Sequence, residues 1–171
     1  MTLTEKPTLF FEFHGSETSV AEQSEMVKEF AIENGGNEFK ASTNNEERNK
    51  LWKARHDAYW ASTSLIPNSK CIVTDVCVPI SNLATCITET KKDMDQTNLV
   101  YTLVGHVGDG NFHLIILFTN DEEYKKVEEA NDRLVHRSLR MKGTCTGEHG
   151  VSFQFYVLII FLRLELEKKN F

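Results

Sequence analysis

The stretch that decides the fold is LVYTLVGHVGDGNFHLIILF, residues 99–118. Two apolar, β-branched runs flank the dipeptide Asp109-Gly110. Such a dipeptide between such runs predicts a β-hairpin, because a type I′ turn needs positive φ at both central residues. A two-residue turn here pairs His106 with His113, and a four-residue loop keeps the same pairing. The two imidazoles then stand on one face, with Cβ atoms roughly 4.5–5.5 Å apart.

Two histidines placed in this way are either a metal-binding pair or a coincidence. A carboxylate and a third histidine follow in GTCTGEHG, residues 143–150. Glu148 with His106 and His113 makes a two-histidine, one-carboxylate set, which binds divalent first-row metals and leaves positions open for a substrate. The alternative is that both histidines form hydrogen bonds at a strand edge while Glu148 faces water.

Length and composition fit one ordinary domain with a substantial core. The chain has 171 residues, of which 40% are hydrophobic and 26% charged. Its formal net charge of −6, without a Lys/Arg cluster, argues against a nucleic-acid partner, since phosphate binding needs a basic surface. The four cysteines lack C-x-x-C spacing, which favours reduced, mostly buried thiols over a zinc knuckle or a dithiol redox motif.

The two ends of the sequence carry no recognisable targeting or membrane signal. The N-terminal stretch lacks a basic region leading into an apolar core, and it is not an Arg-rich transit peptide. The apolar run YVLIIFL, residues 156–162, is far short of the ~20 residues needed to cross a bilayer. We therefore expect no targeting segment in this chain and no membrane partner.

The order of apolar patterns predicts an α+β fold of ferredoxin-like character, with a mixed or antiparallel sheet covered by helices. The hydrophobic pattern, together with the turn-forming residues that bound each run, predicts strands at residues 8–14, 37–42, 70–80, 99–107 and 111–118. Helices are expected from Ser19 to the Gly35-Gly36 pair, from an Asn44 or Asn45 cap to Ser62, and from a Ser81 cap to about Gln96. A last, long helix is expected from residue 121, with Gly143 just beyond its end. No nucleotide-binding glycine motif is present.

The motif GHVGDGNFH, followed by TGEHG at residues 146–150, resembles the C-terminal, substrate-binding domain of FAD-linked oxidases of the vanillyl-alcohol-oxidase type. The segments PTLFFEFHGS, LWKARHDAYW, TDVCVPIS and KGTCTGEHG also resemble this family, in order and with similar spacings. Within the family the match is strongest to the mitochondrial branch that oxidises D-lactate. We expect residues 7–150 to form the substrate- and metal-binding domain.

The resemblance implies a metal centre and a proton acceptor. His106, His113 and Glu148 match the positions that hold zinc or manganese in the family, and His149 matches the catalytic base. A 2-hydroxy acid would bind the metal, His149 would take the hydroxyl proton, and the α-hydrogen would leave as hydride to the flavin.

The resemblance also implies substrate contacts and partners. Arg55 matches the arginine that binds the substrate carboxylate, while Asn111 and Lys70 match substrate-side polar positions. The implied activity is that of an FAD-dependent D-2-hydroxy acid dehydrogenase, mitochondrial, that oxidises D-lactate to pyruvate and passes electrons to cytochrome c. Alternatives are a D-2-hydroxyglutarate dehydrogenase, a glycolate-oxidase-type enzyme, or a non-enzymatic truncated isoform.

Two departures from the family pattern matter. The FAD-binding domain has no counterpart in this sequence, so we expect the isolated chain not to oxidise D-lactate; dye reduction by the purified chain with added FAD would contradict this. From Val151 the residues form a divergent apolar tail, 151–171, for which we hypothesise alternative splicing, intron read-through or a gene-model error. Transcripts with one continuous exon through this junction would count against that hypothesis.

Overall fold

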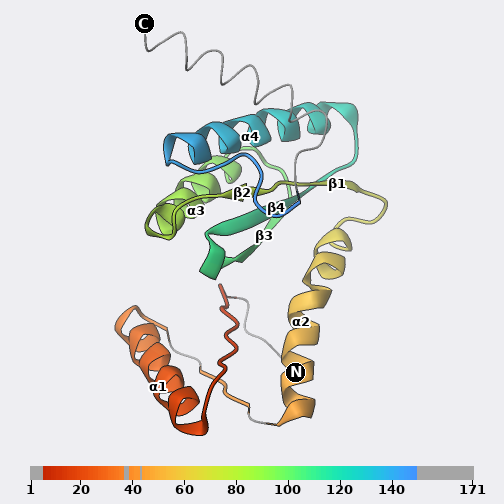
Figure 1. Cartoon of the computed structure of the whole chain (residues 1–171). Coiled ribbons are helices and arrows are strands. Elements are labelled where there is room, and N and C mark those ends of the chain that lie inside the picture. Colours follow the sequence, from red (N-terminus) through yellow and green to blue (C-terminus); the bar gives the residue numbers. More distant parts are fainter. Residues whose placement is uncertain (1–5, 37–38, 43, 150–171) are drawn as a thin grey trace, which may run out of the picture. The chain divides into compact units, whose positions relative to one another are not determined.

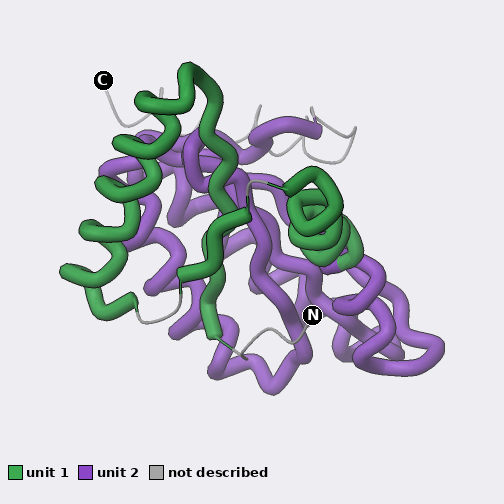
Figure 2. The backbone as a smooth tube through the Cα atoms, turned by 90° about the horizontal axis from the view of Figure 1, so that it is seen from below, with its two compact units in different colours: residues 1–57 green, residues 58–171 purple. Residues whose placement is uncertain are grey.

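The chain divides into two compact units. The structure, a computed structural model, describes residues 6–36, 39–42 and 44–149. Residues 1–57 form the first unit and residues 58–171 the second (Figure 2). The divergent tail expected at 151–171 lies outside the described residues.

The first unit consists mainly of helix. The α1 helix, Glu17–Glu33, begins where the Ser16 hydroxyl accepts a hydrogen bond from the Ser19 N–H, and it ends before Gly35, whose φ is 85°. The α2 helix, Asn45–Thr63, is preceded by Asn44, whose side-chain oxygen accepts from the Glu46 N–H at 2.8 Å. Both helices were expected, since capping side chains and glycine stops are local signals.

Two predicted strands are wrong. Residues 8–14 and 39–42 have no strand assignment, and residues 37–38 lie outside the described part of the chain. The aromatic-rich alternation of residues 8–14 is typical of a strand, but a strand forms only when a neighbouring backbone takes up its N–H and C=O groups. No such pairing with residues 8–14 occurs within the described residues.

The second unit is built on an antiparallel sheet around the central strand β4, Asn111–Phe118 (Figure 1). The β3 strand, Tyr101–His106, pairs along one edge of β4. The short strands β1, Lys70–Val73, and β2, Val76–Cys77, follow one another along the other edge. The predicted α+β class is therefore confirmed, with an antiparallel sheet.

The hairpin forms, but its predicted register is wrong. His106 pairs with Asn111, and Val104 pairs with His113. The connection is a four-residue loop made of a 3-10 turn, η1 at Val107–Asp109, and Gly110 with φ 75°. This register differs from the predicted one by two residues, and side chains alternate with a period of two. His106 and His113 therefore still share a face, as diagonal neighbours.

The core lies between one face of β4 and two helices, α3 at Ile80–Met94 and α4 at Asp121–Arg140 (Figure 1). Phe112, Leu114 and Ile116 pack there with residues of both helices, and each is at most 1% exposed. Full burial of such a side chain contributes roughly 1.5–3 kcal/mol. The predicted Ser81 cap is wrong, because α3 begins directly after Pro79 and has no side-chain cap.

The opposite face of β4 begins with Asn111 and His113 and continues with Ile115 and Leu117. The end of α2, residues 58–63, belongs to the second unit and lies on this face: Thr102, which pairs with Ile115, donates to the Ser62 hydroxyl at 2.8 Å. Cysteines 71, 77, 86 and 145 are free thiols; Cys86 and Cys145 are buried, whereas Cys71 and Cys77 are only partly buried. Of the helices in the described residues, none has the length and apolarity needed to traverse a membrane.

Replacement of Gly110 tests the hairpin geometry. Alanine at this position would adopt an unfavourable left-handed φ, and its Cβ would collide with the carbonyl oxygen of Val78. We expect Gly110→Ala to lower the free energy of unfolding by at least about 2 kcal/mol in urea denaturation. Gly108→Ala is the matched control, since no atom of the described residues lies within 4 Å of a Cβ placed at Gly108. Equal effects of the two substitutions would contradict this geometry.

Candidate metal centre

The candidate site is formed where the strand pairing along β4 is interrupted between β1 and β2. Both strands follow one register on β4, and Thr74 and Asp75 lie between them, level with Leu114 and His113. The Leu114 N–H donates to the Thr74 hydroxyl oxygen at 2.9 Å instead of to a strand carbonyl. The Thr74 carbonyl is thereby left to accept a hydrogen bond from Nδ1 of His113, at 2.9 Å.

His113 is held in one orientation and one tautomer. Its side chain is only 6% exposed, and its Nδ1 must carry the proton that Thr74 accepts. Nε2 is therefore the nitrogen that could offer a lone pair to a cation, and it lies 2.9 Å from Oε1 of Glu148. An imidazole lone pair and a carboxylate oxygen are both acceptors, so a proton or a metal cation is needed between them.

Glu148 lies between the two hairpin histidines. Its Oε1 faces His113 Nε2, while its Oε2 is 3.6 Å from Nε2 of His106. One ligand atom from each of the three residues lies within 4.8 Å of the others. A tetrahedral ion with bonds of about 2.1 Å holds its ligand atoms about 3.4 Å apart, so small side-chain movements suffice. The donor set therefore fits a divalent metal.

His149 lies on the solvent side of this cluster. Its side chain is 63% exposed, and its Nε2 is 3.4 Å from Oε1 of Glu148. Its ring centre is 5.3 Å from that of His113. His149 could also form a ligand group with Asp75 and His113. That group is the weaker candidate, because both carboxylate oxygens of Asp75 already accept hydrogen bonds.

Asp75 is a site residue that the sequence interpretation missed. Burial disfavours its ionisation, but hydrogen bonds from the backbone of His149 and Gly147, and from the side chains of Asn111 and Thr146, outweigh that effect and lower its pKa. A signal was present: Asp75 is the one acidic residue in the stretch 70–80, which is apolar apart from Lys70, Thr74 and Asp75 itself. A carboxylate inside a buried strand needs partners.

The structure brings Asn111 to the cluster but not Lys70. Asn111 is 4% exposed, and its Nδ2 donates to Asp75 Oδ1 and to the Val76 carbonyl oxygen. Its Oδ1 is buried and has no hydrogen-bond partner among the residues that the structure describes. Lys70 pairs with Phe118, five residues along β4 from His113, or roughly 17 Å away. Arg55 lies on α2 in the first unit, and its role stays a prediction.

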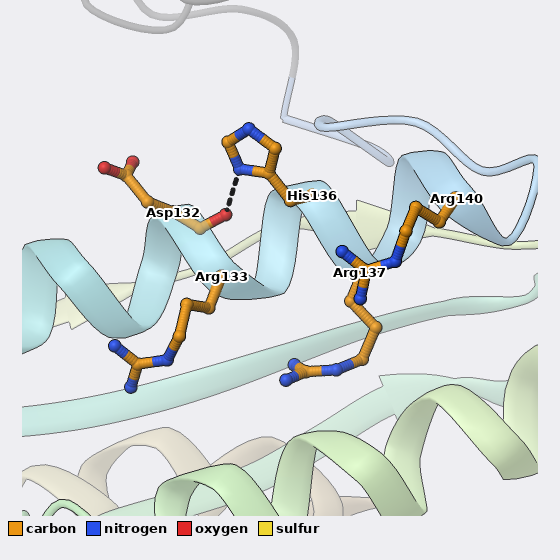
Figure 3. Close-up of a pocket in the computed structure, with 5 residues that line it drawn as sticks. All are labelled: Asp132, Arg133, His136, Arg137 and Arg140. Atoms are coloured by element: carbon orange, nitrogen blue, oxygen red, sulfur yellow. Dashed lines mark hydrogen bonds between the residues drawn. The ribbon is translucent and has the colours of Figure 1, made fainter.

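A separate hollow of about 420 Å³ lies along α4 and is lined by Asp132, Arg133, His136, Arg137 and Arg140 (Figure 3). Arg133 and Arg137 both pair with Asp93 of α3, at 2.9 and 2.8 Å. These ion pairs join the two helices that cover the core face of the sheet. The histidine cluster lies on the other face, so this hollow is not part of the candidate metal centre.

Comparison with known proteins defines the family. The family described as FAD linked oxidases, C-terminal domain, matches residues 2–154. The chain belongs to this family.

Individual relatives agree with this assignment. A probable mitochondrial D-lactate dehydrogenase of Danio rerio is 51% identical over 147 residues, which are 85% of this chain and 30% of the relative. A mitochondrial D-lactate dehydrogenase [cytochrome] of Arabidopsis thaliana is 44% identical over 151 residues, 87% of this chain and 27% of that protein. The glycolate oxidase subunit GlcD of Escherichia coli K12 is 28% identical over 145 residues, 84% of this chain and 29% of the subunit. The chain thus spans about 30% of the length of these relatives.

Substitution of Thr74 tests the hydrogen bond from the Leu114 N–H to the Thr74 hydroxyl. Thr74→Val keeps the side-chain shape but leaves the buried Leu114 N–H without an acceptor. We expect a loss of about 1–3 kcal/mol in the free energy of unfolding and faster hydrogen exchange at the Leu114 amide. Thr74→Ser, which retains the hydroxyl, is the control and should keep this amide slow. Similar exchange in both variants would show that the hydroxyl is not the acceptor.

Proposed function

We propose that residues 7–150 form the substrate- and metal-binding part of an FAD-dependent D-2-hydroxy acid dehydrogenase that oxidises D-lactate to pyruvate. The observation that carries this proposal is the Glu148 carboxylate between His106 and His113. Membership of the FAD-linked oxidase family and the two D-lactate dehydrogenase relatives support the reaction.

In this proposal His106, His113 and Glu148 hold a divalent ion, zinc or manganese. When bound, such an ion makes a coordinated hydroxyl group more acidic and leaves positions for the oxygens of a 2-hydroxy acid. The residues favour this role because the Nδ1 hydrogen bond of His113 directs its Nε2 toward Glu148. His106 and Glu148 are half-exposed, so the ion remains accessible to a small substrate.

The remaining site residues bind and deprotonate the substrate. His149 accepts the hydroxyl proton at a ring nitrogen, which suits an imidazole near neutral pH and its exposed position beside Glu148. Arg55 binds the substrate carboxylate through its forked guanidinium. Asn111 is a substrate-side polar group in this proposal, supported by its place beside the cluster, where its Nδ2 donates to Asp75 Oδ1.

In the whole enzyme we propose FAD as the hydride acceptor, cytochrome c as the electron acceptor and the mitochondrion as the location. The family description names FAD, and the Arabidopsis relative is named for cytochrome and the mitochondrion. The glycolate-oxidase alternative is weaker, since the identity to that subunit is 28% against 51% and 44%. The non-enzymatic alternative predicts metal binding without a response to substrate.

Metal binding is the first measurement. We expect the purified chain to bind one divalent ion, measured by elemental analysis and by calorimetric titration with Zn²⁺ and Mn²⁺. The His106→Ala, His113→Ala double variant removes two of three ligands and should bind none at this site. His136→Ala is the control, because His136 is exposed on α4 and belongs to neither ligand group. A wild-type chain without metal affinity would refute the proposed centre.

Substrate class is tested on the chain loaded with Co²⁺. D-lactate should change the visible absorption of the bound ion, because its hydroxyl and carboxylate would enter the coordination sphere. Propionate, which lacks the hydroxyl, is the control, and D-2-hydroxyglutarate and glycolate test the alternatives. A spectrum that no hydroxy acid alters would favour the non-enzymatic isoform.

A further inference from the structure

The segment 146–149 carries both Glu148 and His149, yet it has no regular secondary structure. The chain just before this segment pairs with the sheet through an isolated bridge between Thr144 and Cys77, where the Thr144 N–H donates to the Cys77 carbonyl oxygen at 2.8 Å. That bridge precedes Glu148 by four residues. It does not by itself orient Glu148 toward the two hairpin histidines.

The carboxylate of Asp75 receives the hydrogen bonds that orient this segment. Its Oδ2 accepts from three consecutive backbone N–H groups, those of Gly147 at 2.8 Å, Glu148 at 3.1 Å and His149 at 3.0 Å. The Thr146 hydroxyl donates to the same oxygen at 3.2 Å. Successive N–H groups that converge in this way form an anion-binding turn, and here the anion belongs to the protein itself.

The position of Asp75 is fixed independently of the segment it holds. Asp75 follows Thr74 in the sheet, level with His113, and its Oδ1 is 3.5 Å from His113 Nδ1. Asn111 Nδ2 donates to the same oxygen at 2.8 Å. The side chain of Asp75 is 12% exposed. One carboxylate therefore connects the strand that carries His113 to the segment that carries Glu148.

The close approach of this segment to the sheet depends on Gly147. A Cβ at Gly147 would collide with Asn111 Nδ2 and would lie 2.7 Å from Asp75 Oδ1. Only a residue without a side chain lets the backbone reach the carboxylate. Asp75 and Gly147 are thus complementary, although they are 72 residues apart in the chain.

We propose that Asp75 is the positioning residue of the metal centre: it holds the 146–149 segment so that Glu148 completes the ligand set with His106 and His113. This inference rests on the proposed metal-binding function. Asp75 acts through the backbone of its neighbours and not as a ligand, since both of its oxygens are engaged. A neutral amide in its place would direct an NH₂ group either at the segment's N–H donors or at Asn111.

The test compares Asp75→Asn with Asp132→Asn in the full chain; Asp132 is exposed on α4, and the change in charge is the same. We expect Asp75→Asn to weaken Zn²⁺ binding about 10–100-fold. The amides of Gly147, Glu148 and His149 should exchange at least about tenfold faster, while those of β3 and β4 keep their protection. Asp132→Asn should change neither quantity. Unaltered affinity with unaltered exchange in Asp75→Asn would overturn the proposal, as would equal loss of protection throughout the sheet.

A second measurement needs no variant. Scalar couplings across hydrogen bonds, from the amide nitrogens of residues 147–149 to the Asp75 carboxyl carbon, should be detectable in the wild-type chain, and their absence would overturn the proposal even if Asp75→Asn failed to fold. Different results would refute the proposed metal centre and the proposed role of Asp75. A wild-type chain that binds no metal but shows these couplings would refute the metal centre alone, with Asp75 still holding the segment. A chain that binds metal without them would refute only the role of Asp75.

Discussion

The hydrogen bond from the Leu114 N–H to the Thr74 hydroxyl is the interaction on which the candidate metal centre depends. It replaces a normal ladder bond without changing the register of β1 and β2 on β4. The Thr74 carbonyl is then available to His113, so the ring is fixed and its Nε2 faces Glu148. A side-chain hydroxyl inside a sheet thus decides which nitrogen of a histidine is able to bind a cation.

The central strand β4 serves two purposes because its faces differ. All eight of its residues are buried, but Phe112 and Leu114 contribute to the apolar core with α3 and α4, while Asn111 and His113 face the polar cluster. The first face packs in the apolar core, and the opposite face carries the candidate metal ligand His113. Asp75 extends this arrangement, since it is held by the sheet and in turn holds the segment with Glu148.

The local parts of the fold were predictable from sequence. Asn120 accepts a hydrogen bond from the Glu123 N–H at the start of α4, and acidic residues fill the first turn of that helix as the helix dipole favours. The strand predicted at residues 8–14 was wrong because alternation alone does not supply a pairing partner. Ser81 was wrongly expected to cap α3, since Pro79, which ends the preceding extended segment, takes the position before the first helical residue.

The sequence by itself determined the hairpin, the residue types of the candidate ligand set and the shared face of His106 and His113. That face survives a register shift of two residues because the strand period is two. Only the tertiary structure decided that His106 pairs with Asn111, and that Asp75 binds backbone groups up to 74 residues away. The physical reason is distance along the chain: caps and turns are encoded by neighbouring residues, whereas contacts between remote segments depend on how the strands align.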